Sequence, residues 1–260
     1  MLAEFLANAQ QIALHASPVA AAAAAGAASH ECESRDAAAK AAHAGMEQIR
    51  SYMQRIQFAD LGLTCSLESL ILGVPMQGHR DRPPCVRFFD VLDHAALTVA
   101  LIIAPTGSSI PLHDHPGMHV FTKVLVGQMD VEMFDVGQSL PRFAIPLGAT
   151  VGVGNTRTVT LRTGELYELT PVVGNIHGLT CTSHETAVVL DIMLPPYAGD
   201  DACHYFAATD SSTQLCVIDE ALAWGTGDSS MASEASSTKV QGKKGARGSG
   251  GGVRGVRKRF

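Results

Sequence analysis

Two histidines separated by a single residue are the first side chains in the sequence that could do chemistry. His113 and His115 lie between Pro111 and Pro116, with Gly107 a few residues upstream. On an extended strand, side chains at i and i+2 project from the same face, so both imidazoles could bind one metal ion. Because such pairs also arise by chance or for packing, the pair alone is weak evidence, and a metal site requires a ligand from elsewhere in the chain.

The residues around this pair follow a recognisable spacing. Gly107, five intervening residues and the two histidines resemble the first motif of the cupin superfamily, which continues with a glutamate and a glycine. Gly127 supplies the glycine, but the glutamate position falls on Val120 or, in the shorter variant of the motif, on His119. The carboxylate ligand of ordinary cupins is therefore missing.

The same resemblance supplies a third histidine. Pro171, Gly174 and His177 have the Pro-x-x-Gly-x-x-His spacing of the second cupin motif, although Cys181 stands where that motif usually has asparagine. The implied site consists of His177 and the two histidines of the first motif, all neutral. A divalent metal there would keep its full charge and open positions, which favours an anionic ligand such as a thiolate. Imidazole also suits zinc, so the ligand set alone does not choose between iron and zinc.

Three segments resemble the cysteamine dioxygenases and plant cysteine oxidases, a family of thiol dioxygenases. They are IPLHDHPGMHVFTKVLVG at 110–127, GNIHG at 174–178 and VLDIMLPPY at 189–197, and the resemblance extends roughly from Phe58 to Phe206. It implies a cupin that holds Fe(II) on the three histidines and adds both atoms of O₂ to a thiol, giving a sulfinic acid. The substrate would be 2-aminoethanethiol or the N-terminal cysteine of a protein, and the latter would make protein turnover depend on oxygen.

Asp191 and Tyr197 are the candidates for catalytic roles. Asp191 interrupts an apolar segment, and the family has an aspartate near the metal at the matching position. The resemblance implies that its carboxylate binds the amine two carbons from sulfur, which both substrates share; an ion pair with a basic neighbour is the alternative. Tyr197 follows Pro195 and Pro196, a rigid pair that would aim it either at an oxygen near the metal or into the core.

Other residues give weaker signals. Cys203 and Tyr205 match a family pair that can become cross-linked, and plain burial of both is the alternative. Tyr167 and Cys181 are weaker candidates still. His119 would face the metal only if the preceding Pro-Gly turn preserves strand register. We interpret the other histidines as loop, surface or helix-face residues: His15, His30, His43, His79, His94, His184 and His204.

The elements that must position these residues change period along the chain. Met46, Ile49, Met53 and Ile56 form one apolar stripe, which predicts a helix over 36–58. Short runs rich in β-branched residues, separated by Gly or Pro, predict strands at 96–104, 120–126, 129–136, 156–162, 165–169 and 187–194. The expected fold is all-β, a cupin jelly-roll barrel (double-stranded β-helix) with N-terminal helices and disordered tails.

Composition divides the chain into three parts. Residues 1–35 are Ala-rich, with a helix expected at 1–16; residues 36–225 hold the predicted helix and the cupin thiol dioxygenase domain; residues 226–260 are rich in Gly, Ser and basic residues. Eight of the 19 lysines and arginines lie in 239–260, where Asp and Glu are absent. We expect this tail to be disordered and to serve solubility or nucleic-acid binding.

Charge and cysteine content limit the partners. The net charge is −6 despite the basic tail, so the domain itself is acidic, which argues against nucleic acid as its ligand. No apolar stretch reaches the roughly 20 residues that a membrane helix needs. The six cysteines are scattered and the N-terminus lacks a signal-peptide pattern, so we expect a monomer in the cytoplasm or the nucleus.

These observations favour an Fe(II)-dependent thiol dioxygenase acting on an amino-thiol and O₂, with a role in oxygen sensing by analogy. Two alternatives stay open, a zinc or manganese cupin isomerase or hydrolase and a non-catalytic metal-binding cupin. The missing carboxylate ligand, taken with Asp191 and Tyr197, favours the dioxygenase.

Overall fold

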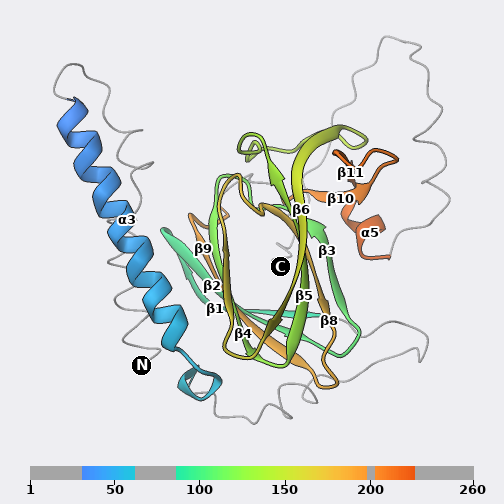
Figure 1. Ribbon diagram of the computed structural model, residues 1–260, viewed down its shortest axis with the longest axis horizontal. Coiled ribbons are helices and arrows are strands. Elements are labelled where there is room, and N and C mark those ends of the chain that lie inside the picture. Colours follow the sequence, from blue (N-terminus) through green and yellow to red (C-terminus); the bar gives the residue numbers. More distant parts are fainter. Residues whose placement is uncertain (1–30, 62–85, 198–202, 226–260) are drawn as a thin grey trace, which may run out of the picture.

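The computed structural model describes residues 31–61, 86–197 and 203–225, in which β-strands dominate (Figure 1). In chain order the elements are α3 (Glu31–Arg55), η1 (Phe58–Leu61), β1 (Arg87–His94), β2 (Leu97–Ala104), β3 (Ser109–His113), β4 (His119–Val126), β5 (Gln128–Val136), β6 (Thr150–Arg162), β7 (Leu166–Leu169), β8 (Ile176–Cys181), β9 (Ala187–Leu194), β10 (Tyr205–Ala208), β11 (Gln214–Ile218) and α5 (Glu220–Ala223). The helix expected at 1–16 and the disorder expected at 226–260 lie outside the described residues.

Antiparallel pairing arranges the strands in two sheets. The five-stranded sheet has the order β1-β2-β9-β4-β7, and the closed sheet runs β10-β11-β6-β5-β8-β3 and returns to β10. Besides hairpins such as β1-β2, β5-β6 and β10-β11, both sheets pair strands from distant parts of the chain, such as β2 with β9 and β3 with β8, as in a jelly roll. The predicted all-β cupin fold is confirmed.

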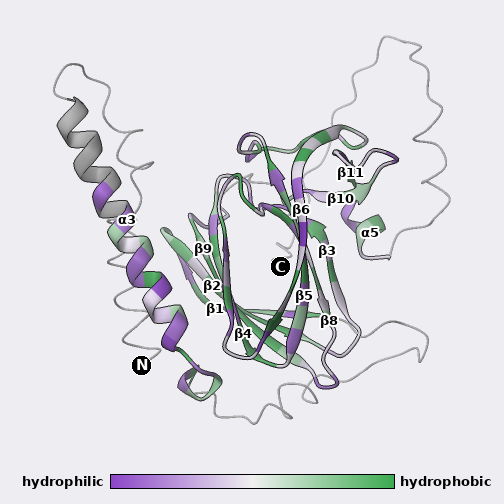
Figure 2. Ribbon diagram, in the orientation of Figure 1, coloured by the Kyte–Doolittle hydropathy of each residue, from purple (hydrophilic) through white to green (hydrophobic). Residues whose placement is uncertain are grey.

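The five-stranded sheet has an outer face, which α3 covers, and an inner face, which packs against the closed sheet (Figure 1). Along β9 the side chains alternate between the two. Leu190 and Ile192 pack against the helix, whereas Val189 packs among residues of the closed sheet such as Met129. Hydrophobic residues therefore fill both sides of this sheet, and Figure 2 shows its strands as mostly apolar.

Helix α3 buries the stripe that its sequence predicts. Ile49 and Met53 are fully buried against the sheet and Met46 packs beside them. The helix begins at Glu31 rather than at residue 36 and ends at Arg55 rather than at residue 58. Among the described residues, neither α-helix has the length and apolar character needed to cross a lipid bilayer.

The strands that the sequence did not predict are polar or short. β1 contains Asp90, Asp93 and His94 and is mostly half-buried at the edge of its sheet, so it lacks a clear apolar pattern. β10 and β11 are short. β6 starts at Thr150 rather than at residue 156, and its mostly exposed first half was not predicted because glycines and polar residues interrupt the apolar pattern there. The predicted strands that form β2, β4, β5, β7 and β9 agree with the structure within one or two residues.

Candidate metal centre

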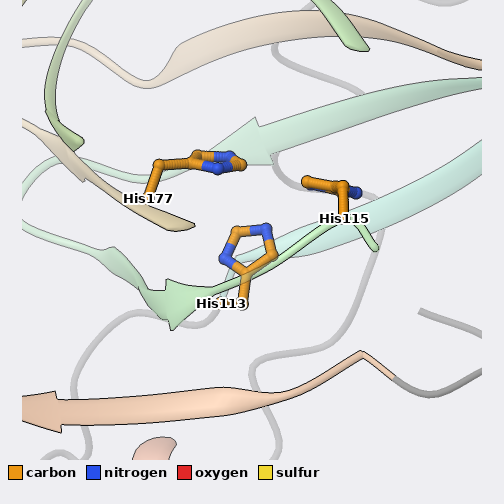
Figure 3. Close-up of side chains that lie close together, drawn as sticks. All are labelled: His113, His115 and His177. Carbon is orange, nitrogen blue, oxygen red and sulfur yellow. The ribbon is translucent and has the colours of Figure 1, made fainter. Parts of the chain in front are cut away.

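Three histidines from two strands and a turn converge inside the closed sheet (Figure 3). His113 is the last residue of β3 and is the direct antiparallel partner of His177 on β8. His115 lies in the turn that follows β3, so regular strand alternation alone does not bring it to the site. One ring nitrogen from each histidine lies within 4.8 Å of the others, which is the spacing of ligands around a single ion.

Hydrogen bonds fix two of these rings. His113 Nδ1 donates to the Pro111 carbonyl at 2.9 Å, which leaves its Nε2 for a metal. His115 Nδ1 lies 3.0 Å from the Tyr197 hydroxyl, and that hydroxyl donates to the Asp114 carbonyl at 2.8 Å. The phenol oxygen therefore accepts the His115 Nδ1–H, and His115 Nε2 is left for a metal.

The three imidazoles are in the protonation state that metal binding requires. Burial lowers the pKa of His113, and it lowers the pKa of His115 and His177 well below the usual value of 6.5. Repulsion from a neighbouring histidine, if that histidine carried a proton, acts in the same direction on His115 and His177. His115 Nε2 and His177 Nδ1 are buried and have no hydrogen-bond partner among the described residues. Buried lone pairs without partners, on neutral rings, fit a divalent cation of the borderline class, iron or zinc.

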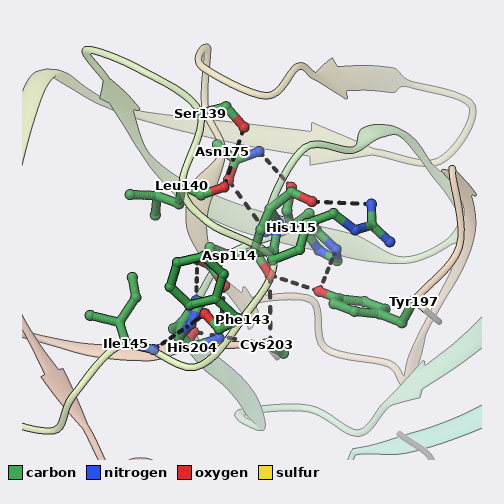
Figure 4. A network of polar contacts seen from close by, with 12 residues as sticks. Asp114, His115, Ser139, Leu140, Phe143, Ile145, Asn175, Tyr197, Cys203 and His204 are labelled. Carbon is green, nitrogen blue, oxygen red and sulfur yellow. Dashed lines mark hydrogen bonds and ion pairs between the residues drawn. The ribbon is translucent and has the colours of Figure 1, made fainter. Parts of the chain in front are cut away.

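A buried pair behind the site anchors the turn that carries His115 (Figure 4). Asp114 points away from the three rings, and its carboxylate accepts hydrogen bonds of 2.7 Å from both the backbone N–H and Nδ1 of His204. His204 Nε2 lies 3.1 Å from Phe143 O and from Ile145 N, in the loop between β5 and β6. Burial raises the pKa of Asp114, and contact with Asp114 raises that of His204 although burial opposes it.

His204 lies in a loop, directly before β10, but the interpretation that it is a surface residue is wrong. The residue is only 4% exposed, because it links the start of β10 to the His115 turn and to the β5–β6 loop. The residues it contacts lie far away in the chain, and no local pattern marks them.

Asn175 is a second residue that the sequence did not reveal. Its side-chain nitrogen donates to His115 O and Thr170 O, each at 2.9 Å, and its oxygen accepts the His115 N–H at 3.4 Å. The preceding Gly174 has φ of +62°, and a Cβ there would lie 3.2 Å from Arg157. The second motif thus contributes His177 and also fixes the backbone of the first motif.

Asp191 lies on the inner face of the five-stranded sheet, in line with Thr122 of β4. It is 8% exposed, and its Oδ1 has no hydrogen-bond partner in the described part of the chain. Burial raises the pKa of Asp191 to about 7, with the Thr122 hydroxyl acting in the opposite direction. The alternative interpretation, a carboxylate paired with a basic side chain, does not match this environment.

The remaining candidates differ in position. Cys203 contacts the phenols of Tyr197 and Tyr205, and its thiol donates to Asp114 O at 3.6 Å. The Tyr205 ring lies 6.4 Å from that of His113, so a Cys203–Tyr205 link remains a prediction beside the site. His119 begins β4 on the face opposite Thr122 and does not join the three rings.

Comparison with known proteins identifies a matching family model and curated relatives. The chain matches the family model PCO_ADO over residues 52–236. It is 32% identical to human 2-aminoethanethiol dioxygenase over 142 residues, covering 47% of this chain and 52% of the human protein. It is 28% identical to plant cysteine oxidase 1 of Arabidopsis thaliana over 164 residues, covering 62% of this chain and 54% of that protein. The matched region is thus about half the length of each relative.

Solved structures with similar strands have low sequence identity. A cupin superfamily protein of Desulfitobacterium hafniense is 14% identical, with a TM-score of 0.31, covering 44% of this chain and 82% of that one. A Klebsiella pneumoniae protein with a double-stranded β-helix domain is 19% identical, with a TM-score of 0.35, covering 49% and 90%. Since the family model spans well over half of the chain, every strand that the structure describes and all three clustered histidines, this chain belongs to the PCO_ADO family of cysteamine dioxygenases and plant cysteine oxidases.

Proposed function

We propose that the protein is an Fe(II)-dependent thiol dioxygenase that converts an amino-thiol and O₂ to the sulfinic acid. The observation that carries the proposal is the cluster of three neutral imidazoles, two buried and one partly buried, which no carboxylate joins among the described residues. Iron bound to them would supply open positions for a thiolate and O₂ and a path for electrons between the two. The reaction balances without another reductant, because sulfur loses four electrons and O₂ gains them, with both oxygen atoms ending on sulfur.

The protein's own residues would hold the ligands and orient the substrate. Tyr197 and Pro111 keep the His115 and His113 rings in the tautomers that present Nε2. Asp191 is buried, lacks a partner on Oδ1, and would accept a hydrogen bond from the substrate amine. The apolar residues between the two sheets would exclude bulk water from the reacting thiol.

The substrate class follows from the spacing of amine and sulfur. An N-terminal cysteine and 2-aminoethanethiol both carry an amine two carbons from sulfur, and a carboxylate fixed beside the metal would recognise either. The names of the relatives, a 2-aminoethanethiol dioxygenase and a plant cysteine oxidase, support this class. A role in oxygen sensing belongs to the same proposal and would require turnover to vary with O₂ over the cellular range.

Metal analysis and oxygen uptake test the proposal together. The purified protein should contain iron, and the iron-loaded form should consume one O₂ per thiol with 2-aminoethanethiol or with a Cys-initiated peptide. Mass spectrometry with isotopically labelled O₂ should show two labelled oxygen atoms in the product. An N-acetylated peptide is the control and should not react. Bound zinc with no O₂ uptake on either thiol would contradict the proposal and favour a zinc cupin.

A further inference from the structure

Three polar side chains form a row across the inner face of the five-stranded sheet. Thr122 on β4 is the direct antiparallel partner of Tyr167 on β7 and of Asp191 on β9. Residues directly opposite each other in antiparallel strands project from the same face. Tyr167 packs with Val120 and Val124 of β4, which share this face, so the whole row lies between the two sheets.

Two atoms of this row are buried without partners. Tyr167 Oη and Asp191 Oδ1 are both inaccessible to solvent and have no hydrogen-bond partner in the described part of the chain. Burial raises the pKa of each group, and the Thr122 hydroxyl between them in the row acts in the opposite direction, so Thr122 is near both without completing either oxygen. A buried hydroxyl or carboxyl oxygen without a partner costs free energy, and native proteins rarely retain one unless a ligand or water completes it. Two such oxygens on one sheet face indicate a site for a group that donates several hydrogen bonds.

The row begins beside the metal centre. The Tyr167 ring meets the His177 ring edge to face, with centroids 6.1 Å apart. Tyr167 also shares a small apolar cluster with Tyr197, the residue that orients His115. A molecule whose sulfur is held at the three histidines would therefore have its next few atoms close to Tyr167.

We propose that Tyr167 is a substrate-binding residue, whose phenol oxygen and the carboxylate of Asp191 together bind the ammonium group of an amino-thiol. This rests on the proposed function, because it takes a thiol at the metal as given. The ammonium offers three N–H donors. Asp191 accepts one and balances the charge, and Tyr167 Oη accepts another. The pair thereby selects thiols that carry an amine two carbons from sulfur.

Tyr167→Phe tests the inference because it removes one oxygen and leaves the ring that packs against His177. Binding is measured anaerobically, by calorimetry on the Fe(II)-loaded full-length protein, with 2-aminoethanethiol and with 1-propanethiol, which has a methyl group in place of the ammonium. We expect the variant to bind 2-aminoethanethiol about tenfold more weakly and 1-propanethiol as the wild type does. In steady-state turnover the KM for 2-aminoethanethiol should rise more than kcat falls.

Two other tyrosines provide matched controls. Tyr197→Phe should weaken the binding of both thiols to the same extent, because it acts through His115, a proposed metal ligand. Tyr52→Phe on α3 removes a phenol oxygen from the other side of the sheet and should change neither affinity. Iron content and circular dichroism of each variant establish that the site and fold are intact.

The outcomes separate this inference from the proposed function. If the wild type oxidises 2-aminoethanethiol but Tyr167→Phe weakens the binding of both thiols equally, or changes the binding of neither thiol, Tyr167 is only a packing residue. If the wild type consumes no O₂ with either thiol, the proposed function and this inference both fail. Should Tyr167→Phe not fold, the wild type is titrated with 2-(dimethylamino)ethanethiol, whose single N–H can satisfy only one oxygen. It should bind about tenfold more weakly than 2-aminoethanethiol, and equal affinity would overturn the inference.

Discussion

Thr122 and Lys123 are neighbours on β4, and their side chains lie on opposite faces of the five-stranded sheet, in two differently packed parts of the interior. Lys123 points to the outer face, where its buried Nζ donates to Gln54 O at 2.8 Å and Ile56 O at 2.7 Å, at the end of α3. Thr122 points to the inner face, toward Asp191 and its unpartnered Oδ1. One residue along the chain thus separates a completed polar contact from an incomplete one.

The difference indicates what each face is for. On the outer face the Lys123 ammonium donates hydrogen bonds to carbonyl groups that have no partner within the helix, so it holds the end of α3 on the sheet. Four of the five buried side-chain atoms that lack a hydrogen-bond partner in the described residues belong to two of the clustered histidines and to the Tyr167–Asp191 row, where a metal and a substrate would complete them; the fifth is on Arg87 of β1. Changes on the outer face should therefore alter stability without altering chemistry, and changes on the inner face should alter metal or substrate binding first.

The largest expected effect is the loss of the metal centre. His177→Ala removes one of three ligands from an apolar pocket, so bound metal should fall to background and turnover should disappear while the folded barrel remains. Elemental analysis, O₂ uptake and circular dichroism measure the three quantities. His184→Ala changes an exposed histidine between β8 and β9 and should keep both metal and activity. Retention of a full equivalent of metal by His177→Ala would show that the rings do not act as one site.

The three clustered histidines could be predicted from the sequence because each of the two motifs is local. His113 and His115 lie two residues apart, and His177 follows a proline and a glycine at fixed distances. The stripe on α3 was equally accessible, since helical period places its members on one face. These features depend on residues close together in the chain, which is the range over which a single sequence carries structural information.

The residues that support the ligands were not accessible in this way. The Asp114–His204 contact joins positions 90 residues apart, and only the order of strands in the closed sheet brings β10 beside β3. Tyr167 gave a weak signal because its neighbours along β7 do not show that Thr122 and Asp191 lie in line with it. Pairing between distant strands is set by the whole fold, and one sequence does not display it.

The next largest effect concerns how stability depends on pH when no metal is bound. The pKa of Asp191 is raised by burial to about 7 from 3.8, so between these values the folded protein keeps a proton that the unfolded chain has lost. Stability contributed by this group is present below pH 4 and declines by roughly 1.4 kcal/mol per pH unit, about 4 kcal/mol in all, as pH rises to 7. Asp191→Asn removes this decline, so metal-free variant and wild type should match near pH 4 and the variant should be more stable at pH 8 in urea unfolding.

Asp135 provides the control of opposite sign. Burial works to raise its pKa, but hydrogen bonds from the Gly174 N–H, Arg157 and Asn155 lower it overall. Its carboxylate therefore stabilises the fold above its unfolded pKa and ceases to do so as pH falls. Asp135→Asn should be less stable than the wild type at pH 7, with the gap closing in acid. If the difference in the free energy of unfolding between the wild type and Asp191→Asn does not change with pH, Asp191 is not buried as described.

A smaller effect, confined to stability, is expected on the outer face. Lys123→Met keeps the apolar stem but leaves the Gln54 and Ile56 carbonyls without their charged donor. Hydrogen bonds to charged groups contribute ~1.5–3 kcal/mol each, and removing a buried charge recovers part of that, so we expect a loss of about 3 kcal/mol in the free energy of unfolding. Urea denaturation measures it. Iron content and kcat should equal those of the wild type, and a drop in either would break the separation between the two faces.

The smallest effect we predict comes from Tyr197, which lies on the inner side but is a completed contact like Lys123. Its hydroxyl accepts the His115 Nδ1–H and donates to Asp114 O, so Tyr197→Phe leaves His115 free to change tautomer and orientation. Partners of this kind change metal affinity by factors of 10 to 100 when removed, and with two other ligands intact we expect about tenfold, measured by competition with a chromogenic chelator. Discrimination between 2-aminoethanethiol and 1-propanethiol should not change, because the Tyr197 hydroxyl already has two hydrogen-bond partners and is not expected to bind the substrate. If the variant instead keeps its iron affinity and loses turnover, the phenol acts on the substrate or on O₂, and a satisfied hydrogen bond would no longer distinguish a supporting residue from a reacting one.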